Sequence, residues 1–108
     1  MGVHNIDSMA AYKEAISASG VAVIDCFATW CGPCKVIAPK IVEFSNTESL
    51  NQNVKYYKVD VDEVPDVAQE LAVRAMPTFI VFKDGEIEET IVGANAKALE
   101  AAIKKVMA

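Results

Sequence analysis

The chain has 108 residues, of which 53% are hydrophobic and 23% charged, and its formal net charge at pH 7 is −5. This length and composition predict one folded domain spanning residues 1–108, with enough buried surface to fold without a metal or a disulfide. The lysines are scattered, so no basic stripe indicates nucleic-acid binding. No apolar run approaches the ~20 residues of a membrane span, and the first residues lack the pattern of a secretory signal. We therefore expect a soluble cytoplasmic protein.

Strand-like and helix-like segments alternate along the chain. Residues 21–27 are almost continuously apolar, which indicates a central strand buried on both faces. Before this strand we expect an edge strand at 3–6 and a helix that is capped by Asp7 or Ser8 and stopped by Gly20. After it we expect a turn at 29–32, a helix from about residue 31 or 33 to 49, a strand at 54–61 and a helix at 64–71. The last expected elements are strands at 78–82 and 86–92 around the Asp84-Gly85 hairpin, and a helix capped by Asn95 that ends near residue 106. The order predicts an α/β fold whose parallel core becomes a mixed sheet through the closing hairpin.

The string Cys31-Gly32-Pro33-Cys34 follows the central strand directly. Two thiols three residues apart on the first turn of a helix can form and break one disulfide. The helix N-terminus favours a thiolate at Cys31, so we expect Cys31 to be the attacking nucleophile and Cys34 the resolving thiol. An inert disulfide is one alternative. A zinc site is another, although Cys26 and His4, the remaining candidate ligands, do not have ligand spacing.

Asp25 interrupts the apolar central strand, which is an unfavourable place for a carboxylate. Strand alternation places Asp25 and Phe27 on one face, with Ile24 and Cys26 on the other. Burial should raise the pKa of Asp25, because desolvation disfavours the charged form. An alternative is a carboxylate that only caps the turn after the strand. Cys26 is expected to be a small buried apolar residue, with a regulatory thiol as the alternative.

Several strings, read together, resemble the thioredoxin family over the full length of the chain. They are Val23-Ile24-Asp25-Cys26-Phe27-Ala28-Thr29-Trp30-Cys31-Gly32-Pro33-Cys34-Lys35, Lys58-Val59-Asp60-Val61-Asp62, Arg74-Ala75-Met76-Pro77-Thr78-Phe79, Lys83-Asp84-Gly85 and Val92-Gly93-Ala94. The resemblance implies a thioredoxin fold, with a five-stranded mixed sheet flanked by four helices. It also implies a general protein-disulfide reductase that works by dithiol–disulfide exchange. Two positions depart from many relatives, which carry Trp in place of Phe27 and Ile in place of Met76.

The resemblance also implies roles for residues outside the cysteine pair. Asp25 would lie beneath Cys34 and relay its proton, with Lys58 as the nearby lysine. Pro77 would be a cis-proline facing the disulfide, which would leave the Met76 backbone free to pair with an extended substrate. The expected substrate-binding platform around Cys31 comprises Trp30, Gly32, Pro33, Met76, Pro77, Gly93 and Ala94. A core position for Trp30 and a simple strand terminator at Gly93 remain alternatives.

The resemblance further implies that no cofactor or metal is bound and that electrons come from NADPH through a thioredoxin reductase. The expected partners are that reductase and disulfide-containing proteins such as peroxiredoxins and ribonucleotide reductase. Nucleic acid and membrane are not expected partners. The Gly32-Pro33 dipeptide favours a reductant over the rival oxidase or isomerase. A binding subunit that uses the platform without turnover is an alternative of another class.

Overall fold

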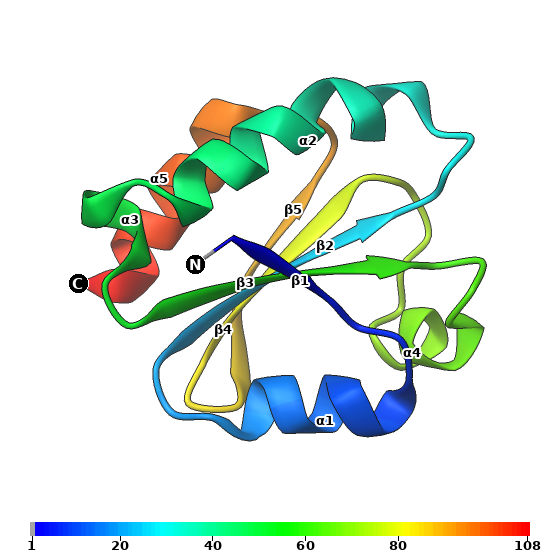
Figure 1. Cartoon of the computed structure of the whole chain (residues 1–108), viewed down its shortest axis with the longest axis horizontal. Coiled ribbons are helices and arrows are strands. Elements are labelled where there is room, and N and C mark those ends of the chain that lie inside the picture. The colour runs from blue at the N-terminus through cyan, green and yellow to red at the C-terminus, as the bar shows by residue number, and fades with distance from the viewer. Residues whose placement is uncertain (1) are drawn as a thin grey trace.

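A five-stranded sheet lies between two layers of helices in the computed structural model, which describes residues 2–108 (Figure 1). The strands are β1 (Val3–Asn5), β2 (Val21–Phe27), β3 (Val54–Asp60), β4 (Thr78–Lys83) and β5 (Glu86–Val92). The helices are α1 (Met9–Ser17), α2 (Gly32–Ser45), α3 (Glu48–Asn51), α4 (Pro65–Glu70) and α5 (Ala96–Met107). No helix within residues 2–108 is long and apolar enough to cross a membrane.

The strand order in the sheet is β1-β3-β2-β4-β5. β1 and β2 each run parallel to β3, whereas β4 is antiparallel to both β2 and β5. The expected mixed sheet is thus confirmed, as is the central position of β2, which is buried along nearly its whole length. A central strand buried on both faces explains why 21–27 is almost continuously apolar.

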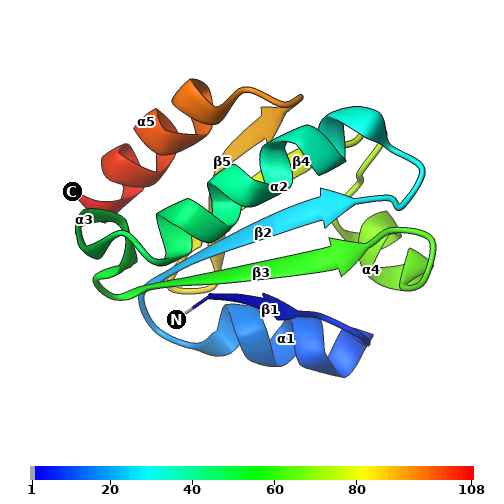
Figure 2. The same ribbon diagram turned by 45° about the horizontal axis from the view of Figure 1, so that its top comes forward.

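Alternating side chains of β2 divide the core into two clusters, one on each face of the sheet. Figure 2 shows helices on both faces of the sheet, with α2 and α5 on one and α1 on the other. Val23 packs with residues of α2 and α5, whereas Ile24 and Cys26 pack with residues of α1 and α4. Asp25 therefore lies on the α2 side, as strand alternation predicts. This face of the sheet also supports the helix that carries the cysteine pair.

Local signals set the ends of several elements. The Ser8 hydroxyl accepts the Ala11 N–H at 3.0 Å at the start of α1, and the Asn95 side chain accepts the Ala98 N–H at 3.0 Å at the start of α5. The β4–β5 hairpin turns at Asp84 and Gly85, whose φ angles are 51° and 87°. This left-handed conformation is the one that an Asp-Gly pair tolerates in a tight hairpin, so the predicted caps and turn are confirmed.

The expected continuous helix to residue 49 is wrong, because α2 ends at Ser45 and a separate turn, α3, follows. The Thr47 hydroxyl donates to the carbonyl of Glu43 at 2.7 Å, and Thr47 itself is extended at φ −92° and ψ 120°. Such local side-chain bonds compete with the helix ladder. The break lets Leu50 enter the same core cluster as Phe44, and it adds a short fifth helix to the four that were expected.

Helix α4 ends in a Schellman-type arrangement. The N–H of Val73 donates to the carbonyl of Ala68 at 3.0 Å, and the N–H of Ala72 donates to the carbonyl of Gln69 at 3.0 Å. The position after the cap residue usually carries glycine, because its backbone is left-handed. Here Ala72 occupies it with a φ of 55°, a conformation that is unfavourable for a residue with a Cβ atom.

Ala72→Gly is therefore expected to stabilise the protein. Glycine adopts the left-handed backbone conformation at position 72 without the cost that alanine has. This should raise the free energy of unfolding by about 0.5–1 kcal/mol, after the greater entropy of glycine in the unfolded chain is subtracted. Urea unfolding at pH 7 measures the difference. Ala68→Gly, inside the same helix, is the control and should be destabilising. A loss of stability in Ala72→Gly would contradict this account of the cap.

Candidate redox-active site

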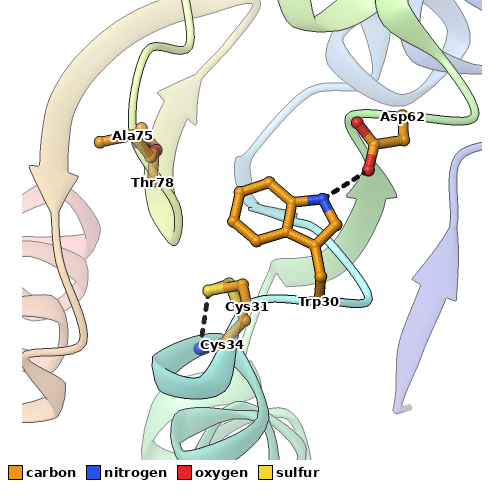
Figure 3. The surroundings of a disulfide bond; sticks show 6 residues. All are labelled: Trp30, Cys31, Cys34, Asp62, Ala75 and Thr78. Carbon is orange, nitrogen blue, oxygen red and sulfur yellow. Dashed lines mark hydrogen bonds between the residues drawn. A yellow bond between two sulfur atoms is a disulfide. The ribbon is translucent and has the colours of Figure 1, made fainter.

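Cys31 and Cys34 form a disulfide at the N-terminus of α2, with their Cα atoms 5.3 Å apart (Figure 3). Cys31 is the N-cap residue, and its sulfur accepts the backbone N–H of Cys34 at 3.1 Å. The N–H of Cys31 donates to the carbonyl of Ala28 at 3.1 Å, which shapes the turn before the helix. Pro33 fits the first helical turn because no intrahelical partner exists there for its missing N–H. The expected pairing of the two cysteines is thus present in the folded chain.

The two cysteines differ more in their surroundings than in their exposure. Cys31 is 5% exposed and Cys34 is 3% exposed, so both are buried. Cys31 lies at the N-cap, where backbone N–H groups and the helix dipole stabilise a negative sulfur. Cys34 instead lines a cavity on the inner side of α2. The arrangement fits an attacking role for Cys31 and a resolving role for Cys34.

The cavity behind Cys34 has a volume of about 350 Å³. Asp25 lines it, and the Oδ1 atom of this carboxyl is buried without a hydrogen-bond partner among the described residues. Burial raises the pKa of Asp25 to about 7, although the positive charge of Lys58 lowers it. Lys58 is the register partner of Asp25 on β3 and lines the same cavity. Asp25, Lys58 and Cys34 therefore line one cavity.

Lys58→Met is expected to raise the pKa of Asp25 further above about 7, because the positive charge of Lys58 lowers this pKa. A ¹³C NMR titration of the Asp25 carboxyl measures the shift. Lys55→Met is the matched control, since Lys55 lies on the same strand but on its opposite face. An unchanged or lowered pKa in Lys58→Met would show that this lysine does not act on Asp25.

The loop before β4 lies against the disulfide. The Met76–Pro77 peptide bond is cis, as expected, and Met76 packs against the cluster formed by Ala28, Cys31 and Cys34. Within residues 2–108, the backbone N–H and carbonyl of Met76 have no hydrogen-bond partner. These polar groups are therefore available to an extended chain that docks beside the disulfide.

The end of β5 is joined to the same loop. The N–H of Gly93 donates to the carbonyl of Pro77 at 2.8 Å. Gly93 has a φ of 103°, a backbone conformation that residues with a side chain rarely adopt. Gly93 thus ends the strand and also brings β5 to the Pro77 loop.

Val92, directly before Gly93, is 63% exposed. It was not among the site residues expected from the sequence, although its outward position follows from strand alternation.

Trp30 is 67% exposed, so a core position for this ring is wrong. Its indole Nε1–H donates to the Asp62 carboxylate at 2.8 Å, as Figure 3 shows. Asp62 was not selected as a site residue from the sequence. The available signal was an acidic residue in the loop after β3, because an indole N–H needs an acceptor. Among the other expected platform residues, Gly32, Pro33 and Ala94 are also exposed.

Cys26 lies apart from the disulfide on the α1 side of the sheet, where it is fully buried. Burial raises the pKa of its thiol to about 12, so the reactive thiolate is strongly disfavoured. The burial of Cys26 agrees with the expectation that it is a small apolar core residue.

Within the described part of the chain, no three His, Cys, Asp or Glu side chains converge in the way that a metal site requires.

The chain is similar to many known proteins. The profile of the thioredoxin family matches residues 3–105. Thioredoxin-2 of Pyricularia oryzae is 54% identical over 103 residues, which cover 95% of this chain but only 58% of that longer protein. Thioredoxin Asp f 29 of Aspergillus fumigatus is 50% identical, and the match covers 94% of each chain.

Comparison of the fold with solved structures also finds thioredoxins. The crystal structure of the Malassezia sympodialis thioredoxin Mala s 13 superposes with a TM-score of 0.93 at 46% sequence identity. The superposition covers 100% of this chain and 94% of that one. Sequence identity at this level, together with a shared fold and a cysteine pair at the start of α2, shows common descent. The chain therefore belongs to the thioredoxin family.

Proposed function

We propose that this chain reduces disulfide bonds in other proteins, with Cys31 as the attacking thiol and Cys34 as the resolving thiol. As a thioredoxin, the chain is a thiol–disulfide oxidoreductase whose redox-active group is the cysteine pair. The observation that carries the proposed roles is the Cys31–Cys34 disulfide at the N-terminus of α2, with Cys31 as the N-cap and Cys34 facing the Asp25 cavity.

The reaction proceeds through two exchanges. The Cys31 thiolate attacks one sulfur of a substrate disulfide, which forms a mixed disulfide and releases the other substrate sulfur as a thiolate. The Cys34 thiolate then attacks the Cys31 sulfur, which closes the Cys31–Cys34 disulfide and releases the second substrate sulfur. Two electrons pass to the substrate, and the two protons of the dithiol end on the substrate thiols directly or through solvent.

Asp25 acts as the proton acceptor for Cys34 in this scheme. An acid or base is most effective when its pKa is close to the ambient pH, and burial raises the pKa of Asp25 to about 7. Asp25 and Cys34 line the same cavity, and the Oδ1 atom of Asp25 has no hydrogen-bond partner among the described residues, so this carboxyl is the proposed acceptor of the Cys34 proton. Lys58 keeps the pKa from rising further.

The surface around Cys31 is proposed to dock an extended segment of the substrate. Trp30 supplies an exposed aromatic face, while Gly32 and Pro33 lie exposed on the first turn of α2. The unpaired backbone groups of Met76 can form strand-like hydrogen bonds to the docked segment. Ala94 and the half-buried Gly93 are proposed to extend this surface, whereas Pro77 is itself buried and shapes the loop that carries Met76.

The proposed electron donor is NADPH, acting through a thioredoxin reductase. Peroxiredoxins and ribonucleotide reductase are the proposed substrate proteins. Support for a peroxiredoxin comes from a 39% identical chain solved in a study of thiol resolution in yeast mitochondrial 1-Cys peroxiredoxin through glutathione and thioredoxin systems. We further propose that residues 1–108 form one domain that acts in the cytoplasm. The continuous sheet supports the single domain.

The direct test is insulin reduction with NADPH and a fungal thioredoxin reductase. Catalytic amounts of this protein should accelerate NADPH oxidation in proportion to its concentration. Protein whose cysteines have been alkylated is the control and should show only the background rate. No acceleration, in an assay where a related thioredoxin is active, would refute the proposed reductase function.

A further inference from the structure

Asp60 is a buried acid that the reaction above does not use. It lies at the end of β3, beside the last residue of β2, and is 8% exposed. Its Oδ1 atom accepts the backbone N–H of Asp62 at 2.9 Å, and its carbonyl accepts the N–H of Val64 at 2.9 Å. An aspartate that accepts the N–H two residues ahead forms an Asx turn. Asp60 thus fixes the start of the loop at 61–64.

This loop is held close to the disulfide. The N–H of Val61 donates to the carbonyl of Phe27 at 2.9 Å, at the end of β2. Val61 also packs against the cluster that contains Cys31 and Cys34. Val61 thus joins the start of this loop to the end of β2, close to the cysteine pair.

The loop also holds the exposed tryptophan. The Asp62 Oδ2 atom accepts the indole N–H of Trp30 at 2.8 Å (Figure 3). Trp30 is 67% exposed, so few packing contacts restrict its ring. A charge-assisted hydrogen bond is stronger and more directional than a neutral one. Two bonds in series thus connect the buried Asp60 carboxylate with the orientation of the Trp30 ring.

We propose that Asp60 is a positioning residue that acts through Asp62 to hold the Trp30 indole in the orientation in which protein disulfides dock beside Cys31. The proposal rests on the proposed reductase function, since it concerns the docking step of that reaction. Asp60 touches neither substrate nor reacting sulfur. Its effect should appear in the binding of protein disulfides and not in the intrinsic reactivity of Cys31.

The chain contains one tryptophan, so its fluorescence reports on Trp30 alone. In the reduced protein, Asp60→Ala and Asp62→Ala should each increase the fast component of the Trp30 anisotropy decay, because the ring loses its fixed acceptor. Asp60→Asn and Asp62→Asn keep an acceptor oxygen and should restore decay close to that of the wild type. Glu63→Ala is the matched control, because Glu63 is an exposed acid in the same loop.

Kinetics separate docking from chemistry. Asp60→Ala and Asp62→Ala should raise the KM for insulin about fivefold with little change in kcat, as expected when an interaction common to the ground and transition states is lost. The rate with hydroxyethyl disulfide, which needs no extended docking surface, should stay within about twofold of the wild type. The double variant should resemble Asp62→Ala alone, because Asp60 acts through Asp62.

Three results would overturn the proposal. They are an unchanged Trp30 anisotropy decay in folded Asp60→Ala, equal losses of activity with insulin and with hydroxyethyl disulfide, and additive effects of the two alanine substitutions. If Asp60→Ala does not fold, Asp60→Ser replaces it, because a serine hydroxyl forms the same turn more weakly and should give an intermediate decay. A wild-type protein inactive with insulin would refute the reductase function, whereas the anisotropy measurements would still test the Asp60–Asp62–Trp30 connection.

Discussion

Cys31→Ser and Cys34→Ser are expected to lose activity in different ways. Cys31→Ser removes the attacking thiolate, so insulin reduction should fall by several orders of magnitude and no adduct should form. Cys34→Ser keeps the thiolate at the N-cap of α2 but removes the resolving thiol. It should therefore accumulate a mixed disulfide between Cys31 and the substrate, because no second thiol releases it. Mass spectrometry after mixing each reduced variant with an oxidised target distinguishes the two outcomes.

Cys26→Ala is the matched control for this experiment. Cys26 is fully buried on the other face of the sheet, and the raised pKa of its thiol keeps it protonated at neutral pH. This variant should turn over like the wild type and form no stable adduct. Stable adducts at Cys34 in Cys31→Ser, with none at Cys31 in Cys34→Ser, would reverse the proposed roles.

Asp25→Asn is expected to increase stability at pH 7 while it slows catalysis. Burial raises the pKa of Asp25 in the folded protein to about 7, whereas an aspartate in an unfolded chain has a pKa of ~3.9. Below ~3.9 the carboxyl is neutral in both states, so it does not disfavour folding. As the pH rises from ~3.9 to about 7, the carboxyl releases its proton in the unfolded chain but keeps it in the folded protein. This difference favours the unfolded chain, so the wild type loses stability over this range. The loss levels off above the pKa of the folded protein.

The size of this loss follows from the shift in pKa. At pH 7, Asp25→Asn should be more stable than the wild type by up to roughly 4 kcal/mol, and the advantage should disappear near pH 3. Urea unfolding at both pH values measures the difference. Glu88→Gln is a control, because this side chain is exposed on β5 and its substitution should change stability little at either pH.

Catalysis provides the second measurement on Asp25→Asn. Without the proton acceptor, Cys34 should be deprotonated more slowly, so the mixed disulfide with a substrate should persist longer. Stopped-flow measurement of substrate release, as a function of pH, follows this step. A variant that is less stable at pH 7 and fully active would show that Asp25 only caps the turn after β2.

The elements could be predicted from the sequence where short-range interactions determine them. The caps at Ser8 and Asn95 and the turn at Asp84-Gly85 depend on atoms a few residues apart. The face of Asp25 follows from strand alternation, which is a property of a single strand. The break between α2 and α3 was missed, because the Thr47 side-chain bond and the burial of Leu50 in the cluster of Phe44 both replace the regular helix there.

The site shows the same division between local and long-range interactions. The spacing of Cys31 and Cys34 and their place at the start of a helix identified the reactive pair, because a disulfide at this spacing is a local arrangement. The family resemblance added Lys58 and the cis bond at Pro77, both of which the structure places in the surroundings of the pair. Composition and spacing alone pointed to neither.

Sequence by itself thus determined the order of the strands and of every helix except α3, the reactive cysteine pair and the buried position of Asp25, since these depend on residue type and on spacing along one segment. Tertiary structure alone decided which separate loops meet at the pair. The Asp62 carboxylate reaches Trp30 across 32 positions of the chain, and Gly93 binds the Pro77 carbonyl only because β4 and β5 pair in register. Contacts of this kind depend on how the strands assemble into the sheet, and no local pattern in the chain encodes them.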